Sequence, residues 1–336
     1  MTTDRVITQQ ETESVFGSVD SPGRRFAQFI GRYGIVIALV GLSAISAVAS
    51  PYFLTVTNLF NVALQASVIT IVAIGMTFVI TSGGIDLSVG SIVALAGMAM
   101  ADLSVHGWGA PAAVAGGLAL GTACGVVNGL LITRISLPPF IVTLGTMSAY
   151  RGLALIYNQG RPIYGLPRED VQIIAGYVGP VPIPVILAAV VAVLGWFILN
   201  ETQIGRYTTA IGGNEEVARL CGINVDRYKV VVYGICGLLC GLAAVILTAR
   251  LYAAEPIAGV LFELEAIAAT VMGGTNLMGG YGTIVGTVAG ALLMSVLRNL
   301  FNLLNIQAYY QQLAIGVVII LAVSIDQLRR RPKKRR

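Results

Sequence analysis

The acidic residue set most deeply in apolar sequence is Asp86, which lies between two long apolar runs. An ionised carboxylate at membrane depth needs a partner or water, and such residues commonly mark transport pathways. The neighbouring Gly83 and Gly84 permit irregular backbone, which a membrane tolerates only where it is buried in protein or lines a cavity. Two roles stay open for Asp86: it caps a helix that begins at Leu87, or it contacts a transported solute.

A second segment repeats this local pattern. Residues 83–90 read GGIDLSVG and residues 273–280 read GGTNLMGG, so both fit G-G-x-[D/N]-L-x-x-G. Each segment interrupts an apolar run, and paired interruptions in two halves of a transporter commonly lie at the substrate path. Chance is a rival explanation in a chain with 40 glycines. Polar residues in or beside the apolar runs are the candidates for a translocation path: Asn61, Gln65, Asp86, Ser88, Asn128 and Asn276.

The longest strongly polar loop, about residues 200–228, contains the signals of a short helix. Two glycines precede Asn214, which is a good N-cap, and two glutamates follow it where they suit the positive end of a helix dipole. Gly222 can end this helix after about two turns. The predicted amphipathic helix either docks a partner or lies on lipid. The residues predicted to contact a partner are Gly212, Asn214, Glu215, Glu216 and Arg219.

Motifs of enzymes are absent from the sequence. It contains no G-x-x-x-x-G-K-[ST] phosphate loop, so the chain is not its own ATPase. The single histidine, His106, provides no catalytic triad and no zinc-binding H-E-x-x-H. The four cysteines suggest neither a disulfide framework nor a metal site. We therefore predict that the chain is not an enzyme and has no catalytic residues, no cofactor and no metal.

The composition identifies the elements that must position these residues. Of 336 residues, 56% are hydrophobic and 11% are charged, with a mean hydropathy of +0.82. A soluble domain is about 25% charged, and a membrane-spanning helix needs about 20 apolar residues. The sequence predicts an all-α polytopic membrane protein with about ten transmembrane helices. They are expected near 33–50, 59–80, 88–104, 110–132, 139–157, 183–199, 229–250, 262–274, 282–302 and 309–325.

Basic residues orient these spans. Sixteen Lys and Arg residues fall in the segments assigned to the inner side and five in the outer ones, which predicts that both termini are inside. We expect residues 1–31 to be a disordered cytoplasmic leader, residues 32–328 to be the membrane domain, and residues 329–336 to be a basic cytoplasmic tail. Membrane lipid, rather than nucleic acid, is the expected partner of that tail.

Glycine recurs every fourth residue over 117–129 and again over 282–290. Such stripes let two helix backbones approach closely. We interpret them as static packing surfaces rather than as moving interfaces.

Residues 73–91, AIGMTFVITSGGIDLSVGS, resemble the signature of ribose-type permeases of bacterial ATP-binding-cassette sugar importers. That family also includes permeases for xylose, arabinose, galactose and fructose. The resemblance extends over roughly residues 34–328, with similar order and spacing at 139–147, 200–205, 210–219 and 263–269. One departure is that the glutamate-alanine-alanine pattern of other importers is absent, and NEEVA stands at 214–218.

The resemblance implies a type II importer-like permease fold in the bacterial inner (plasma) membrane. It implies a homodimer with ATP-binding subunits below, which hydrolyse ATP, and a periplasmic or lipid-anchored sugar-binding protein above. Residues 204–224 would then be the coupling loop that fits a groove on the ATP-binding subunit. The two interrupted segments would lie near the path of the sugar, whose identity the sequence does not specify.

Other functions also fit the residues. A proton-coupled secondary transporter would use Asp86 as its protonation site and would need no ATPase. A related importer could carry a non-sugar polar metabolite, such as an autoinducer furanose. A membrane scaffold is the third alternative, and the interrupted spans argue against it.

Overall fold

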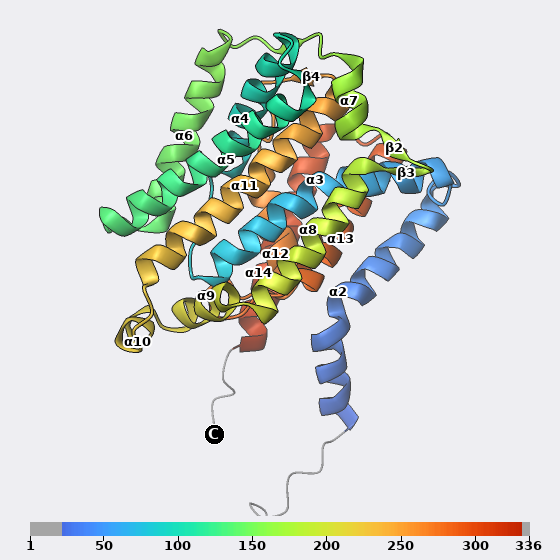
Figure 1. Ribbon diagram of the computed structural model, residues 1–336. Coiled ribbons are helices and arrows are strands. Elements are labelled where there is room, and N and C mark those ends of the chain that lie inside the picture. The colour runs from blue at the N-terminus through green and yellow to red at the C-terminus, as the bar shows by residue number, and fades with distance from the viewer. Residues whose placement is uncertain (1–21, 331–336) are drawn as a thin grey trace, which may run out of the picture.

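The structure of the protein is a computed structural model that describes residues 22–330, and it is mostly helical (Figure 1). The helices at the predicted spans are α2 (Pro22–Ala49), α3 (Val56–Thr81), α4 (Val89–Val105), α5 (Gly109–Arg134), α6 (Pro139–Tyr157), α8 (Ile183–Glu201), α11 (Val225–Leu251), α12 (Phe262–Met272), α13 (Ile284–Leu303) and α14 (Ala308–Arg330). The other helices are α7 (Arg168–Ala175), α9 (Gln203–Gly213) and α10 (Glu215–Leu220). A helix therefore occupies each of the ten ranges predicted from hydropathy.

Six of the described helices are long and apolar enough to cross a membrane: α3, α5, α6, α8, α11 and α13. Two shorter apolar stretches, Gly34–Ala49 and Val89–Val105, have similar character. The prediction of a polytopic helical membrane protein is confirmed at this level. The count of ten crossings and the orientation of the chain stay predictions.

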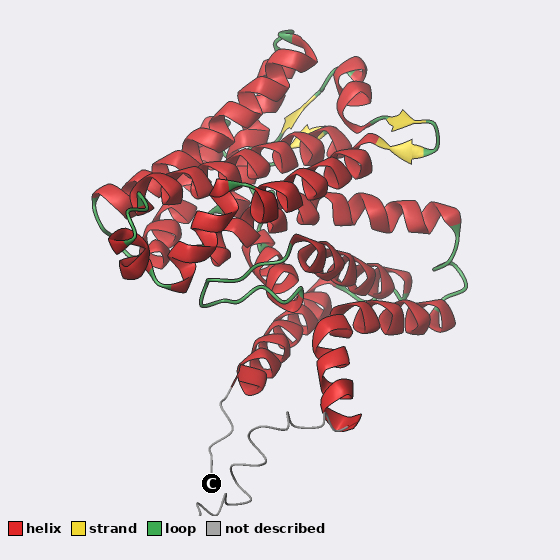
Figure 2. Cartoon of the chain, turned by 60° about the horizontal axis from the view of Figure 1, so that its bottom comes forward, coloured by secondary structure: helices red, strands yellow, loops and turns green. Residues whose placement is uncertain are grey.

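Two small antiparallel ribbons lie at one end of the molecule. Strand β1 (Ile163–Tyr164) pairs with β4 (Ala253–Ala254), and β2 (Tyr177–Val178) pairs with β3 (Val181–Pro182). Figure 1 shows β4 and α7 at the top, whereas α9, α10, the start of α2 and the end of α14 lie toward the bottom. After a 60° turn, Figure 2 again shows the start of α2 and the end of α14 at one end. The polar connection that contains α9 and α10 is thus on the side of both described chain ends.

The core forms around α3 and α11. Every residue of α3 from Ala66 to Thr81 is buried. This segment is apolar on all sides, which is typical of a helix surrounded by other helices. The neighbours of α3 and α11 include α4, α5 and α13. The interruption after Thr81 is therefore held inside the helix bundle.

The glycine stripe of α5 faces α11. A Cβ atom added to Gly121 would lie 2.7 Å from the Cα of Gly241, and one added to Gly117 would lie 2.9 Å from a methyl group of Val245. Gly237 of α11 has the same relation to Gly125, since an added Cβ would lie 2.8 Å from its Cα. The predicted close packing is confirmed, and the partner surface is a second glycine pair that the stripe alone did not identify.

The predicted termini need one correction. Residues 1–21 of the expected leader and residues 331–336 of the expected tail lie outside the described residues. Residues 22–31, which we expected to be disordered, form the first turns of α2, and Arg329 and Arg330 end α14. Once an apolar span has formed a helix, each added residue contributes one backbone hydrogen bond, so the helix extends into the polar flank.

Candidate functional site

The polar connection between α8 and α11 contains the predicted short helix. The Asn214 side chain accepts a hydrogen bond from the Val217 N–H at 3.0 Å, and α10 runs from Glu215 to Leu220. Gly222 follows with φ +81°, a conformation that glycine adopts at little cost. The predicted N-cap and helix are confirmed. The preceding α9, which holds Gly212, was not predicted as a separate helix.

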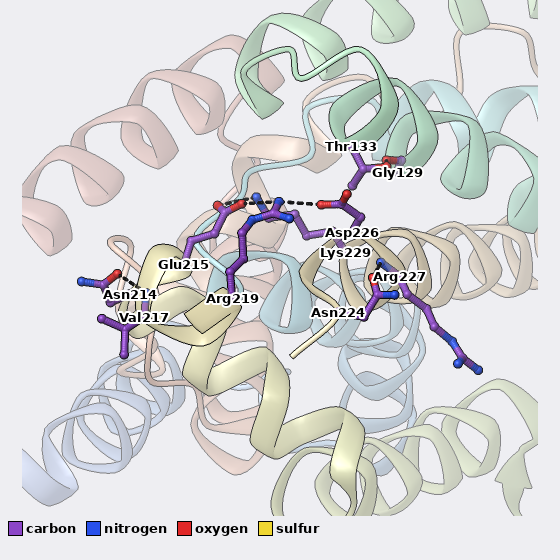
Figure 3. Close-up of polar contacts among 10 residues, drawn as sticks. All are labelled: Gly129, Thr133, Asn214, Glu215, Val217, Arg219, Asn224, Asp226, Arg227 and Lys229. Carbon is purple, nitrogen blue, oxygen red and sulfur yellow. Dashed lines mark hydrogen bonds and ion pairs between the residues drawn. The ribbon is translucent and has the colours of Figure 1, made fainter. Parts of the chain in front are cut away.

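Side chains of α10 turn toward α11 and form a chain of ion pairs (Figure 3). Lys229 Nζ lies 2.6 Å from Glu215 Oε2. Arg219 Nη2 lies 3.2 Å from Glu215 Oε1 and 2.5 Å from Asp226 Oδ1. The Lys229 side chain is only 14% exposed, whereas that of Arg219 is 50% exposed. Because exposed ion pairs contribute little, the contact between Lys229 and Glu215 is the stronger tie between α10 and α11.

These contacts favour the charged forms of Glu215 and Arg219 at neutral pH. Partial burial alone would raise the pKa of Glu215, but hydrogen bonds and charge from Lys229 and then Arg219 outweigh it and lower the pKa below its ordinary value. Hydrogen bonds to Asp226 and Glu215 raise the pKa of Arg219. Glu215 and Arg219 therefore serve the attachment of α10 to its own chain.

The outward surface of α10 consists of other residues. Leu220 is 81% exposed and Val217 is 51% exposed, three positions apart on the helix, and Glu216 beside them is also exposed. Five residues were predicted to contact a partner. Two of them, Glu216 and the N-cap Asn214, are exposed and form no ion pair with any described residue. Gly212 instead packs inward against the backbone of Thr81. The i, i+3 spacing of two apolar residues in a polar helix was the signal that sequence reasoning missed.

Asp86 lies in the interruption between α3 and α4, where it is fully buried. Its Oδ1 accepts hydrogen bonds from the Ser88 N–H at 2.9 Å and from the Ser88 hydroxyl at 2.6 Å. The helix begins at Val89 rather than at Leu87. Asp86 therefore stabilises the turn that leads into α4, and no salt bridge of the described residues includes it.

A buried polar chain connects Asp86 to neighbouring helices. Asn128 of α5 donates to the Ser88 hydroxyl at 2.8 Å, and Tyr150 of α6 donates from its hydroxyl toward Asn128 Oδ1 at 3.2 Å. The Ile85 carbonyl is 3.2 Å from the Thr143 hydroxyl. The structure thus brings together three of the predicted path residues, Asp86, Ser88 and Asn128. It places them in a closed network in which all three are fully buried.

The other interrupted segment contains the same turn. Asn276, at the position equivalent to Asp86, accepts a hydrogen bond from the Met278 N–H at 3.1 Å, again two residues further along. Its amide also donates to the Gly279 carbonyl at 2.7 Å. The shared sequence pattern therefore corresponds to a shared local structure, so the repeat is more than a coincidence of composition.

The remaining two path candidates lie elsewhere. Asn61 is exposed and Gln65 is partly buried, and both belong to the early part of α3. At about 1.5 Å per residue, Gln65 lies roughly 24 Å along the helix from Thr81. The structure does not bring them near Asp86. Gln65 Oε1 is buried and is the one such side-chain atom in the described part of the chain without a hydrogen-bond partner.

Several polar contacts between distant parts of the chain were not identified from the sequence. Arg298 of α13 pairs with the buried Glu265 of α12. The Asn58 and Asn299 side chains exchange hydrogen bonds at 3.0 and 2.8 Å, which joins α3 to α13. Arg151 donates to the carbonyls of Pro256 and Ala258 at 2.7 and 2.8 Å. A charged residue in apolar sequence indicates that its side chain has an ion-pair or hydrogen-bond partner. The sequence does not indicate which residue that partner is.

Open polar space lies beside the attachment of α10. A cavity of about 280 Å³ is bordered by Gly83, Gly84, Met278, Lys229 and Tyr233, among others. A neighbouring cavity of about 260 Å³ shares Glu215 and Lys229 as lining residues. The ion pair between these two residues therefore separates two open spaces, one of which reaches both interrupted segments.

Similarity to known proteins extends over most of the chain. Residues 58–323 match the family model described as branched-chain amino acid transport system / permease component. The ribose import permease protein RbsC of Escherichia coli strain K12 is 46% identical over 296 residues, covering 87% of this chain and 92% of that protein. RbsC of Bacillus subtilis strain 168 is 43% identical over 321 residues, covering 95% and 98% respectively.

A permease for another sugar is also similar. The D-allose transport system permease protein AlsC of Escherichia coli strain K12 is 42% identical over 305 residues, covering 90% of this chain and 94% of that protein. No solved structure matches the chain.

Proposed function

Because the chain belongs to this family of transport-system permeases, we propose that it is the membrane subunit of an ATP-binding-cassette importer for a monosaccharide of the ribose type. The observation that carries the proposal is the 46% identity to a ribose import permease over 92% of that protein. The relatives named for ribose and D-allose both support a sugar as the solute. The chain is a multi-pass protein of the inner membrane.

The energy for transport comes from another subunit. The chain is a transporter subunit and not an enzyme, and its sequence contains no phosphate-binding loop. ATP hydrolysis belongs to a separate ATP-binding subunit of the importer. The permease must therefore contain a surface that receives movement from that subunit.

For the membrane topology we propose ten spans with both termini inside, in a type II importer-like fold. The bias of basic residues supports this orientation. The start of α2, the end of α14 and the α9–α10 connection lie toward one end of the molecule, which also supports it (Figure 1). Residues 32–328 would form the permease domain, with a cytoplasmic leader before it and a basic cytoplasmic tail from residue 329.

The outward face of α10 is the proposed contact with the ATP-binding subunit. Val217 and Leu220 offer apolar surface, and Glu216 lies beside them. Glu215 and Arg219 would act indirectly, because their pairs with α11 fix the direction of α10. Gly212 would also act indirectly, through its packing against the membrane domain.

Two further partners complete the proposed importer. A periplasmic or lipid-anchored sugar-binding protein would deliver the solute to the end opposite α10. A second copy of the permease would lie beside this one in the membrane. Most apolar residues of α6 and α8 are not buried within the chain, so these two helices would face that copy and lipid. No nucleic acid takes part in this assembly.

The sugar path is proposed to run beside the interrupted segments. Asn276 is partly exposed and is the candidate there, while Asn61 and Gln65 are candidates nearer the other end of α3. Asp86, Ser88 and Asn128 would contribute by fixing the first interruption, since all three are fully buried. This burial also gives no support to a proton-coupled transporter that uses Asp86, because such a residue needs access to water.

Coupling requires that the partners distinguish two states of the permease. ATP binding would shift the permease between inward-facing and outward-facing states, and the binding protein would deliver sugar to one of them. A partner with equal affinity for both states would shift nothing. Attachment of the ATP-binding subunit to α10 supplies the required difference if α10 is displaced between the states.

The proposal is tested by reconstituting the permease in liposomes with its ATP-binding subunit and binding protein. We expect ATP-dependent accumulation of labelled ribose or a related monosaccharide. Accumulation by the isolated chain under a pH gradient, abolished by Asp86→Asn, would instead establish the proton-coupled alternative. Uptake of a non-sugar metabolite, with no monosaccharide transported, would reject the sugar assignment alone.

The docking surface has its own test. Leu220→Asp places a charge in the proposed apolar contact and should lower both uptake and ATPase stimulation by about tenfold, the scale of a central interface residue. Cys221→Ser is the matched control, because Cys221 is the next exposed residue of the chain and lies outside α10. Equal activity of the two variants would place the contact elsewhere.

A further inference from the structure

Three glycine-containing turns meet where α3 ends. They come from the interruption after α3, from the end of α9, and from the loop between α12 and α13. The Gly280 N–H donates a hydrogen bond to the Thr81 carbonyl at 2.9 Å. Two segments about 200 residues apart in the sequence are thereby joined through their backbones.

Gly212 of α9 is fitted into this junction. A Cβ atom added to Gly212 would overlap the Thr81 carbonyl oxygen and lie 2.5 Å from the Gly280 nitrogen. A Cβ added to the next residue, Gly213, would meet nothing within 4 Å. Two adjacent glycines of one helix therefore differ completely in the space around them.

Gly279 brings the second interrupted segment to the same point. A Cβ added to Gly279 would lie 2.7 Å from the Gly212 carbonyl oxygen and 2.9 Å from the Cα of Gly83. Its φ of +85° is also one that glycine adopts readily. The second interruption thus touches both the end of α9 and the first interruption.

The junction lies next to the proposed docking helix. Only Gly213 and Asn214 separate Gly212 from the first residue of α10. The ion pair of Glu215 with Lys229 attaches α10 to α11 one step further along. Because no long flexible linker lies between them, a displacement of α10 is passed on to Gly212.

We infer that Gly212 and Gly279 are positioning residues, through which α9 and α10 move the two interrupted segments together as one unit. The inference rests on the proposed function, in which an ATP-binding subunit displaces α10. It goes beyond that function by naming the contact that transmits the displacement and by assigning both interruptions to it.

Physical chemistry favours transmission at this place. Backbone atoms in van der Waals contact cannot yield by changing rotamer, as long side chains do. Closely packed interiors pass displacement on, and they switch between discrete arrangements rather than deforming continuously. A side chain at Gly212 would separate α9 from Thr81 and Gly280, while leaving the outward face of α10 intact.

The first test compares Gly212→Ala with Gly213→Ala in the complete importer in liposomes. We expect Gly212→Ala to lower sugar uptake by about tenfold, in the range of measured coupling between sites, while ATP hydrolysis by the complex continues. Gly213→Ala should transport like the wild type. Equal uptake by the two variants would overturn the inference, and so would a parallel loss of ATP hydrolysis with Gly212→Ala, which would indicate lost docking.

A second test does not depend on a folded Gly212 variant. Spin labels at Gly213, which has open space, and at Met278, which is 76% exposed, report the distance across the junction. This distance should stay constant when ATP binds to the complex, while the distance from Gly213 to a label at the exposed Trp108 should change. A change between Gly213 and Met278 would overturn the inference. A wild-type complex that transports no monosaccharide would overturn the proposed function itself.

Discussion

The two interrupted segments share a pattern and a turn but differ in what holds them. Asp86 is fully buried, and its partner Ser88 is bonded to Asn128 of α5. Asn276 is partly exposed, and among the described residues its side chain bonds only within its own loop. One turn is therefore anchored by side chains of other helices, while the other is placed mainly by backbone contacts at glycines.

The same G-G-x-[D/N]-L-x-x-G motif therefore serves two purposes. In the first segment the aspartate organises a polar network that fixes α4 against α5 and α6. In the second segment the asparagine shapes only its own loop, whose position depends on Gly279 and its neighbours. We therefore interpret the segment around Asp86 as the half anchored to neighbouring helices by side chains, and the segment around Asn276 as the half joined to it through backbone contacts at Gly279.

The largest expected effect separates these two halves directly. Asp86→Ala leaves the buried N–H and hydroxyl of Ser88 without their acceptor, and each unsatisfied buried donor costs about 1–3 kcal/mol, so we expect a loss of roughly 2–3 kcal/mol in the free energy of unfolding. Asn276→Ala should cost about 0.5–1 kcal/mol, because both of its hydrogen bonds join uncharged groups and one partner residue, Met278, is exposed. Unfolding of the purified permease in detergent measures both. Equal losses would remove the distinction between the two segments.

A conservative substitution at Asp86 tests whether this residue acts only in the turn or also in transport. Asn at position 86 still provides an oxygen that can accept from Ser88, so Asp86→Asn should retain most of the stability and most of the ATP-driven uptake. A proton-coupled mechanism would instead require the titratable group itself. Complete loss of transport with normal stability in Asp86→Asn would show that Asp86 has a role in transport beyond the turn.

A smaller effect is expected further along the anchored network. Tyr150→Phe removes the hydroxyl that bonds to Asn128 and to the Cys124 carbonyl, at 3.2 and 3.0 Å. A loss of about 1 kcal/mol follows from one net hydrogen bond. Tyr157→Phe is the control on the same helix, since its hydroxyl bonds to Asp102 at an exposed site. Equal destabilisation by both changes would mean that the buried network does not anchor the first segment.

Much of this architecture was predictable from the sequence. Apolar runs of membrane length and their glycine boundaries identified the helices, and the repeated G-G-x-[D/N]-L-x-x-G pattern identified two segments that share a turn. Asn214 was recognisable as an N-cap because a capping bond joins residues only three apart. These features depend on local structure, which local sequence specifies.

What could not be predicted depends on contacts between distant residues. The contact of Glu215 with a partner stays a prediction, but the sequence did not reveal the ion pair of Glu215 with Lys229, which follows 14 positions later. The place of Asp86 on a solute path also stays a prediction, and the sequence did not reveal that Asn128 and Tyr150 close around its turn. Periodicity indicates which residues share a helix face, but not which other helix covers that face.

The smallest expected effect concerns the ion pairs that attach α10 to α11. The pKa of Glu215 is lowered, so the stability that this carboxylate contributes is present above its unfolded pKa, about 4.3, and is lost as the pH falls through the lower folded value. Glu215→Gln should therefore reduce stability by about 0.5 kcal/mol above pH 5 or so, the usual size for a half-exposed pair.

The pH dependence distinguishes this ion pair from a general effect of charge. As the pH falls below the lowered pKa of folded Glu215, the Glu215→Gln variant and the wild type should converge, because both then carry a neutral group at this position. Thermal unfolding in detergent across this pH range measures the convergence. Glu216→Gln, at the exposed neighbouring position, should follow the wild type throughout. If both variants behaved alike, α10 would be held by its helix packing alone, and the contact with Lys229 would have no part in attaching α10 to α11.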